Sequence, residues 1–81
     1  MARYFFDIDD NGLFVPDDEG IDCASRPVMR DTAIGALPGL ASDAPDMGER
    51  HVIKITVRDQ ASKPILLATL TREVGWLDRG A

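Results

Sequence analysis

The stretch of residues 50–71 constrains the fold more strongly than any other part of the chain. From Ile53 to Val57 an apolar residue takes every second position and polar residues take the others, which is the pattern of a strand with one buried and one exposed face. Five residues that include turn-forming Asp and Ser separate this run from a second β-rich run. The sequence therefore predicts a hairpin in which residues 52–58 pair with residues 64–71.

A lone hairpin is only marginally stable in water, so this one needs further strands and a helix against its apolar face. Residues 2–9 alternate in polarity and are rich in aromatic side chains, which favours a strand, and an Asp-Asn-Gly turn leads into a short strand at residues 13–15. Ser25 has the side chain of a helix N-cap, and apolar residues at helical spacing follow it. The predicted fold class is α+β in the order ββαββ: a four-stranded, mainly antiparallel sheet with one helix packed on one face.

The predicted helix contains residues that weaken it. Gly35 and Gly39 each cost about 1 kcal/mol relative to Ala, and Pro38 removes a backbone hydrogen bond. We therefore expect the helix to kink or stop near Leu37, with room for one further turn before Ser42.

Apolar residues on the inward faces of these elements form the predicted core, whereas residues 17–24 and 43–49 are predicted to be loops. The core residues are Tyr4, Phe6, Ile8, Met29, Ala33, Leu37, Leu40, Ile53, Ile55, Val57, Leu66 and Leu70.

The 81 residues are predicted to form a single α+β domain, residues 1–72, followed by a C-terminal tail, residues 73–81. The tail carries Trp76 and Leu77, and such a pair either folds back over the core or docks on a neighbouring subunit. No apolar run approaches the roughly 20 residues of a membrane span, and no secretory signal opens the chain. The lone Cys23 excludes an internal disulfide, so we expect a cytoplasmic protein.

Charge is distributed unevenly along the chain, whose formal net charge is −5. Residues 1–22 hold seven acidic side chains against Arg3, and residues 50–72 hold five basic ones against Asp59. One explanation is that the two ends lie side by side in one sheet and neutralise each other across strands. The other explanation is a head-to-tail or two-fold contact between subunits.

The acidic turn resembles the start of a calcium-binding loop. Asp7, Asp9, Asn11 and the glycine that follows fit its opening pattern, and Asp18 lies at the twelfth position. An EF-hand needs a helix on each side, whereas the residues before Asp7 predict a strand. Calcium binding stays an alternative to a solvated acidic turn, and no cofactor or metal is predicted.

No catalytic constellation stands out. His51 is the only histidine and is interpreted as a surface residue at the start of a strand. Cys23 is interpreted as a small buried apolar residue. Ser25 lacks the glycine pattern of a nucleophile elbow. We therefore predict that the protein is not an enzyme.

A basic stripe offers another alternative. Arg50, Lys54 and Arg58 project from one face of the predicted strand, and Phe5 lies on the neighbouring polar face, where it is exposed unless a partner covers it. Such a stripe could follow a phosphate backbone while the ring stacks on a base. Pairing with the acidic residues of the N-terminal strand explains the same charges, so we do not expect a nucleic-acid partner.

The opening R-Y-F-F-D-I, the D-N-G-L turn, the acidic D-D-E-G and the closing I-T-V-R-D and P-I-L-L-A-T-L resemble a family of short bacterial proteins known only as a domain of unknown function. The resemblance covers about residues 2–71 and implies the ββαββ order but no activity. The chain departs from that family in its helix, where Pro27, Gly35, Pro38 and Gly39 replace a run rich in Ala, Leu, Glu and Arg.

A second resemblance is to the N-terminal module of HicB-like antitoxins. It is carried by the first hairpin, by Val15-Pro16-Asp17 to Gly20 and by the single helix that follows. This resemblance implies that the protein binds a small toxin through its sheet.

We predict a small, non-enzymatic protein-interaction or regulatory module, a homodimer, with a protein partner and no membrane association. The antitoxin-like, calcium-binding and nucleic-acid-binding functions are the alternatives. The predicted interaction surface consists of Phe5, Arg50, Lys54, Arg58, Trp76 and Leu77.

Overall fold

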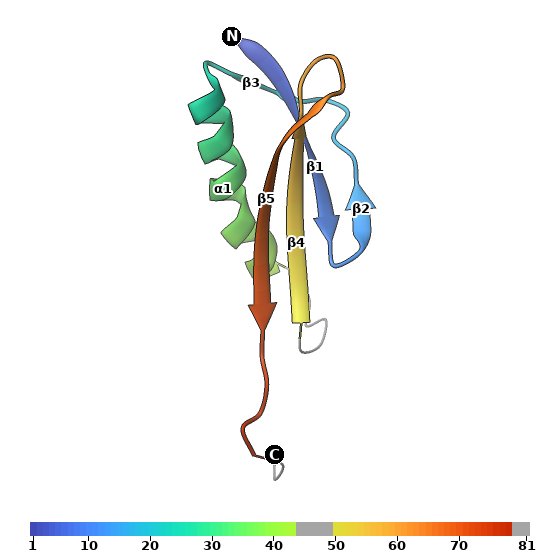
Figure 1. Cartoon of the computed structure of the whole chain (residues 1–81), viewed down its shortest axis with the longest axis vertical. Helices are drawn as coiled ribbons and strands as arrows, with labels where there is room; N and C mark the ends of the chain where they lie inside the picture. The colour runs from blue at the N-terminus through green and yellow to red at the C-terminus, as the bar shows by residue number, and fades with distance from the viewer. Residues whose placement is uncertain (44–49, 79–81) are drawn as a thin grey trace.

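The computed structural model describes residues 1–43 and 50–78 (Figure 1). In chain order its elements are β1 (Ala2–Asp10), β2 (Leu13–Val15), β3 (Ile21–Cys23), α1 (Arg26–Asp43), β4 (Arg50–Arg58) and β5 (Pro64–Glu73). The predicted α+β class, with one helix and an antiparallel sheet, is confirmed. The sheet has five strands rather than the four predicted.

The sheet has the order β2-β1-β4-β5, and β3 pairs with the first residues of β1. All of these pairings are antiparallel. Ile55 on β4 shows the register, because it lies opposite Ile8 on β1 and opposite Ala68 on β5. Opposite residues in an antiparallel pair share a face, so the odd residues of β4 lie on the same side as the even residues of β1 and, from Leu66 onward, of β5. A register shift next to Val57 sets Pro64 opposite Arg58. The predicted hairpin is confirmed, and the N-terminal strand pairs directly with its first strand.

Two tight turns are built from residues at positive φ. Asn11 (φ 53°) and Gly12 (φ 97°) join β1 to β2, and the Asp9 carboxylate accepts the Gly12 N–H at 2.8 Å. Ser62 (φ 64°) lies in the turn between β4 and β5, where the Asp59 carboxylate accepts two backbone N–H groups, both at 2.9 Å. Short acidic side chains stabilise such turns by accepting hydrogen bonds from nearby backbone N–H groups. These residue types are therefore the signal from which the sequence predicted both turns.

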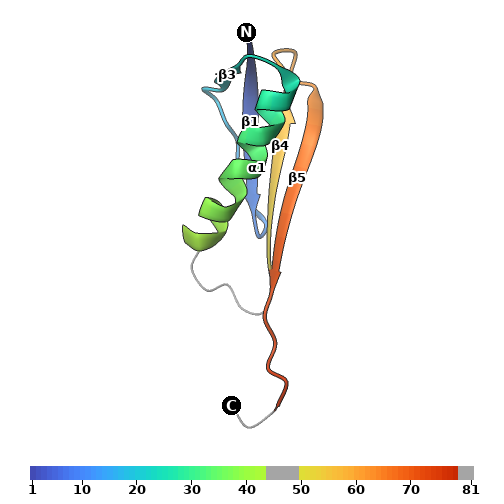
Figure 2. The same cartoon turned by 90° about the vertical axis from the view of Figure 1, so that its left-hand side faces the viewer.

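Helix α1 packs on one face of the sheet, against β4 and β5 with further contacts to β3 (Figures 1 and 2). Ser25 is the N-cap that the sequence predicted, because its Oγ accepts the Val28 N–H at 3.3 Å. Met29, Ala33 and Leu37 form the fully buried side of the helix, at the spacing of one helical face.

The core lies between α1 and the inward face of the sheet. Its buried apolar members are Tyr4, Cys23, Met29, Ala33, Leu37, Ile53, Ile55 and Val57, and partly buried residues packed against them include Phe6, Ile8, Leu40, Leu66 and Leu70. Every predicted core residue belongs to one of these groups, so the predicted core is confirmed. Cys23 also has the buried position that was expected of it.

Two predicted boundaries are wrong. Residues 17–24, predicted to be a loop, contain β3, whose three residues are too few for an alternating pattern to be recognised. A stop of the helix near Leu37 is wrong, because α1 continues through Pro38 to Asp43, whereas a kink at that point stays a prediction. Leu37 is buried in the core and Leu40 packs against it, so apolar burial on both sides of the proline stabilises the continued helix.

Other predicted segments fall partly beyond what the structure describes. Residues 44–49 of the second predicted loop lie outside the described residues, as do residues 79–81 of the tail. The described part of the tail, residues 74–78, runs away from the domain, and the molecule measures 55 × 21 × 18 Å (Figure 2).

Substitution by alanine is expected to have opposite effects on stability at two of the glycines. Gly20 has φ +76°, and a Cβ added there would lie 3.0 Å from the carbonyl oxygen of Tyr4, whereas a Cβ on Gly35 in α1 meets nothing within 4 Å. Gly20→Ala should lower the free energy of unfolding by at least about 1 kcal/mol, and Gly35→Ala should raise it by about 1 kcal/mol. Chemical denaturation followed by circular dichroism measures both changes. Two shifts of the same sign would contradict this geometry.

Candidate functional site

An ion pair on the sheet face away from α1 joins β1 to β4. Arg58 at the end of β4 binds Asp7 of β1 with two hydrogen bonds, from Nε to Oδ2 at 2.6 Å and from Nη2 to Oδ1 at 3.0 Å. Arg58 Nη2 also donates to the backbone oxygen of Asp17 at 3.0 Å. Asp7 is buried, and a two-pronged guanidinium–carboxylate pair is the strong form of this interaction. We name Asp7, Asp17 and Arg58 the carboxylate clamp.

Asp17 fixes the loop of residues 16–20 that connects β2 to β3. Its backbone N–H donates to Asp7 Oδ1 at 2.9 Å. One oxygen of its carboxylate accepts the N–H of Phe6 at 3.0 Å, and the other accepts two N–H groups of the loop at 3.0 and 3.1 Å. Phe6 lies between the part of β1 that pairs with β3 and the part that pairs with β2. The Asp17 carboxylate thus takes the place of a neighbouring strand on the edge of β1 away from β4, between β3 and β2.

The clamp lowers the pKa of both carboxyl groups. For Asp7 the largest cause is the hydrogen bond from Arg58, which together with the Asp17 N–H outweighs the effect of burial. For Asp17 the largest single effect is burial, which raises the pKa. Three backbone N–H groups and the Arg58 charge together lower the pKa by more than burial raises it. The hydrogen bond from Asp7 raises the pKa of Arg58. All three groups are therefore charged at neutral pH.

The prediction that Phe5 is exposed is wrong. Phe5 lies on the outer face, opposite Arg58, but it is half-buried, and the guanidinium carbon of Arg58 lies 5.1 Å from the centre of its ring. A guanidinium at this distance is attracted to the aromatic face. Phe5 is thus partly covered by a side chain of the same molecule.

The other residues of the predicted interaction surface are spread over the molecule. Arg50 Nε lies 3.4 Å from Glu73 Oε1 in an exposed pair between β4 and β5. Lys54 is exposed and lies opposite Asp9 on β1. Trp76 and Leu77 are exposed on the tail. The structure brings Phe5 and Arg58 together, and the basic stripe meets the tail where Arg50 pairs with Glu73.

The oxygens of the acidic turn already have donors within the protein. Asp7 belongs to the clamp, Asp9 accepts the N–H of its own turn, and Asn11 Oδ1 accepts a backbone N–H of β4 at 3.2 Å. Asp18 is exposed in the following loop. In the part of the chain that the structure describes, no group of three or more His, Cys, Asp or Glu side chains is placed to hold a metal ion.

His51 is not the surface residue that the sequence suggested. It is buried at the start of β4, and its Nε2 is hydrogen-bonded to Asp10 Oδ1 on β1. This pair ties β1 to β4 at the end of the two strands opposite the clamp. Because Ser25 caps α1, the residue types of a hydrolytic triad serve separate structural contacts here.

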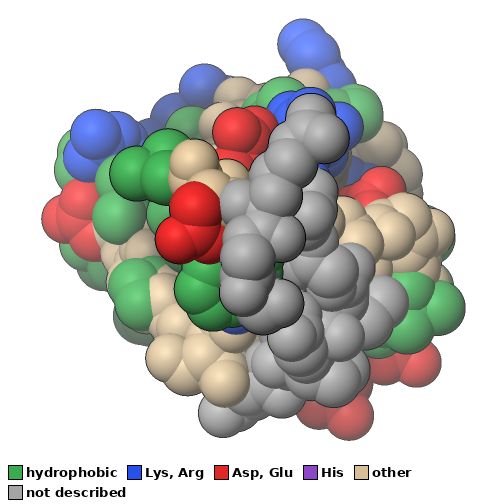
Figure 3. Space-filling model, turned by 90° about the horizontal axis from the view of Figure 1, so that it is seen from below, with side chains coloured by type: hydrophobic (Ala, Val, Ile, Leu, Met, Phe, Trp, Pro, Cys, Tyr) green, Lys and Arg blue, Asp and Glu red, His purple; other side chains and the backbone are tan. Residues whose placement is uncertain are grey.

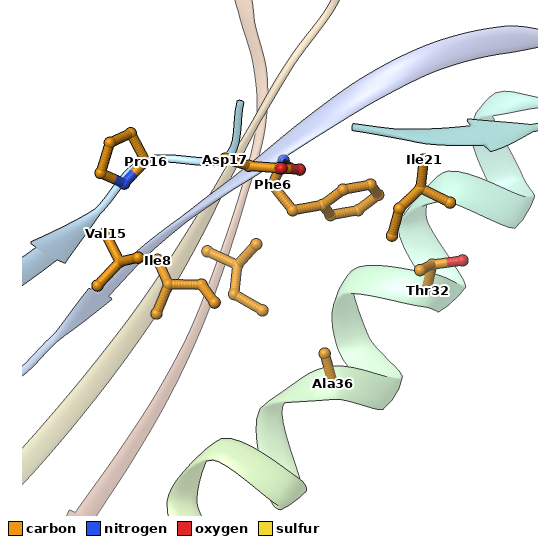
Figure 4. Close-up of a pocket in the computed structure, with 9 residues that line it drawn as sticks. Phe6, Ile8, Val15, Pro16, Asp17, Ile21, Thr32 and Ala36 are labelled. Atoms are coloured by element: carbon orange, nitrogen blue, oxygen red, sulfur yellow. Dashed lines mark hydrogen bonds between the residues drawn. The ribbon is translucent and has the colours of Figure 1, made fainter. Parts of the chain in front are cut away.

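An apolar groove of about 350 Å³ opens between α1 and the strands β1 and β2 (Figure 4). Because α1 lies over β4 and β5, the inward faces of β1 and β2 are left partly uncovered. Figure 4 shows the Phe6 ring pointing from β1 toward Ile21 and Thr32. The groove is lined by Phe6, Ile8, Val15, Pro16, Asp17, Ile21, Thr32, Ala36 and Ile55.

Sequence reasoning finds neither the groove nor the role of Asp17. The one signal for Asp17 is its position three residues before Gly20, which is typical of an acidic side chain that stabilises a turn. The groove has no signal of its own, because it depends on where α1 lies across the sheet. Its walls Val15 and Ile21 also belong to strands of only three residues.

Charges of both signs are mixed on the surface. Figure 3 looks along the long axis of the molecule, and on this end basic, acidic and apolar side chains are interspersed. Arg50 and Arg58 of the predicted stripe are both in ion pairs, with Glu73 and Asp7. Of these pairs, Arg58 with Asp7 joins the basic back of the chain to its acidic front across strands, whereas Glu73 belongs to β5. Among the described residues, no helix is long and apolar enough to cross a membrane.

These features define a small α+β domain with one helix on a five-stranded sheet and a groove beside that helix. A family model described as a domain of unknown function, DUF6894, matches residues 3–71, and the chain belongs to this family. The predicted membership of an uncharacterised domain family is therefore confirmed. Searches of curated proteins and of solved structures found no match to the chain.

The lowered pKa of Asp7 predicts how stability depends on pH. A carboxyl group whose pKa is lower in the folded state contributes stability above its unfolded value, near 3.8, and loses it as the pH falls through the folded pKa. The free energy of unfolding of the native protein should therefore fall as the pH is lowered from about 5 through 3.8 and below. Asp7→Asn should be less stable at pH 7 and show a flatter profile.

Urea denaturation across this pH range measures the difference. Asp18→Asn is the matched control, because it removes an exposed carboxylate next to the clamp without touching Arg58. If the free energy of unfolding of Asp7→Asn depended on pH as that of the native protein does, the clamp would not govern acid stability. The same conclusion would follow if Asp18→Asn flattened this pH dependence.

Proposed function

We propose that this domain is a small, non-enzymatic protein-interaction module that works in the cytoplasm as a homodimer and binds a protein partner in the groove beside α1. The observation that carries the proposal is the groove itself, where Phe6, Ile8 and Val15 remain accessible although their neighbours are in the core. Accessible concave apolar surface of this kind is where proteins bind side chains of a partner. A single, buried Cys23 is compatible with the proposed reducing compartment.

The charges around the groove favour a basic partner. Asp18 and Glu19 follow directly on Asp17 of the lining, and both are exposed. Two further acidic neighbours, Asp22 and Asp31, are each paired with an arginine and add no net charge, so Asp18 and Glu19 give the rim its acidic character. The partner that fits is a segment with a large aliphatic or aromatic side chain flanked by Lys or Arg. Complementary charge would speed its association and orient it.

A second candidate is the antitoxin-like function. Val15, Pro16 and Asp17, on which the resemblance to HicB-like antitoxins rests, line the groove. In that case the partner would be a small basic toxin, and the same acidic rim would bind it.

Catalysis is not part of the proposal. The titratable side chains with shifted pKa values, Asp7, Asp17 and Arg58, bind one another and the backbone. The exposed residues Lys54, Trp76 and Leu77 of the predicted interaction surface lie outside the groove and stay available for further contacts.

Peptide binding to two variants of β2 tests the groove. The probes are a fluorescein-labelled peptide that alternates Leu with Lys and a matched peptide with Glu in place of Lys. Val15 lines the groove and is 51% exposed, whereas Phe14 is 58% exposed and lies on the opposite face of the same strand. Val15→Ser should weaken binding of the Lys peptide about fivefold, because apolar contact area is lost.

Phe14→Ser should leave the affinity of the Lys peptide unchanged, and the Glu peptide should bind more weakly than the Lys peptide. Fluorescence anisotropy measures all of these affinities. Equal effects of the two substitutions would place the binding site elsewhere, and equal binding of the two peptides would remove the argument for a basic partner.

A further inference from the structure

One charged side chain lies among the described residues that line the groove beside α1. Seven of the nine lining residues are apolar, and the two polar ones are Asp17 and Thr32. The Thr32 hydroxyl donates to the Val28 carbonyl oxygen at 2.9 Å, and Figure 4 shows the Thr32 oxygen on the side away from Phe6. The Asp17 carboxylate is therefore the lining group that can bind a polar or charged part of a ligand.

A gap beside β1 brings this carboxylate to the groove. Strand β1 pairs with β3 through residues 2–4 and with β2 through residues 8–10. The Asp17 carboxylate lies between these two segments, where it accepts the Phe6 N–H, and Figure 4 shows the Asp17 side chain pointing toward Phe6. Asp17 thus lines the groove on the helix side, although the ion pair of the clamp lies on the other face of the sheet.

One hydrogen-bonding position of this carboxylate remains open. A carboxylate accepts about four hydrogen bonds, roughly two on each oxygen. Asp17 Oδ1 accepts two backbone N–H groups, whereas Oδ2 accepts the N–H of Phe6 alone among the described residues. The clamp also keeps one negative charge, because Arg58 offsets only one of its two carboxylates. Oδ2 can therefore accept one more N–H group, and the remaining charge favours a cationic donor.

We propose that the groove binds a lysine side chain of the protein partner, with its ammonium group on Asp17 Oδ2 and its aliphatic stem along Phe6 and Ile8. This inference rests on the proposed function and assigns the residue of the partner that enters the groove. A lysine side chain suits such a site, because its stem packs on apolar surface while its ammonium group stays at a polar edge.

The same geometry disfavours arginine. Arginine binds a carboxylate most strongly through two parallel N–H···O bonds, one to each oxygen. Asp17 Oδ1 already accepts two N–H groups, so a guanidinium gains only the single bond to Oδ2. Its other N–H groups would face apolar side chains, and a buried donor without an acceptor weakens binding. The groove therefore prefers lysine to arginine, whereas an open acidic surface has no such preference.

Peptides that differ only in the basic residue test this preference. The fluorescein-labelled peptide that alternates Leu with Lys is compared with matched peptides that carry Arg or acetyl-lysine in place of Lys. Acetyl-lysine keeps the stem and removes the charge. The Lys peptide should bind at least about threefold more tightly than either of the others, as measured by fluorescence anisotropy. An Arg peptide that binds as tightly as the Lys peptide would overturn the proposal.

Two variants test the role of Asp17. Asp17→Asn keeps the shape of the side chain and removes its charge, so the preference for Lys over Arg should disappear. Asp18→Asn is the matched control, because Asp18 is exposed beside the groove but outside its lining, and this variant should keep the preference. A preference that survives in Asp17→Asn or disappears in Asp18→Asn would contradict the assignment.

The native protein gives a second measurement, which applies even if Asp17→Asn does not fold. In an NMR titration that detects side-chain carboxyl carbons, the Lys peptide should shift the Asp17 resonance more than the acetyl-lysine peptide does. Equal shifts would overturn the assignment. A Lys peptide that does not bind, or whose binding is indifferent to Val15→Ser, would overturn the proposed function as well. Binding that depends on Val15 but not on the basic residue would overturn only the lysine contact.

Discussion

The carboxylate clamp is the contact on which the rest of the structure depends. Asp7 lies near the start of the chain and Arg58 far along it, and their hydrogen bonds hold β1 against β4 where the helix gives no support. Through Asp17 the same contact fixes the loop after β2. That loop supplies one wall of the groove, so the site is positioned by an ion pair on the other face of the sheet.

The lateral position of α1 divides the molecule into two surfaces. Over β4 and β5 the helix buries Ile53, Ile55 and Val57 completely, whereas Phe6 and Ile8 on β1 remain partly open. The groove therefore lies along one side of the sheet, and the unpaired edge of β5 lies along the other.

Much of the fold could be predicted from the sequence, because apolar and polar residues alternate regularly along the strands. The strand from Ile53 to Val57, the turn at Asn11 and the cap at Ser25 each have a local signal, and all of them were found. The predictions that were wrong concern features that depend on contacts between residues far apart in the sequence. Pro38 stays helical because of burial on the sheet, and His51 is buried because Asp10 on another strand accepts its hydrogen bond. The groove follows from helix placement, which no local pattern encodes.

A double-mutant cycle on Asp7 and Arg58 tests the central role of the clamp most directly. Urea denaturation of Asp7→Asn, Arg58→Gln and the double variant gives their coupling free energy. Arg30 and Asp31, an exposed pair on α1, provide the reference cycle. If the clamp has this role, the coupling free energy of Asp7 and Arg58 is clearly larger than that of the reference pair. The double variant then loses little more stability than either single variant. Additive losses in both cycles would contradict it.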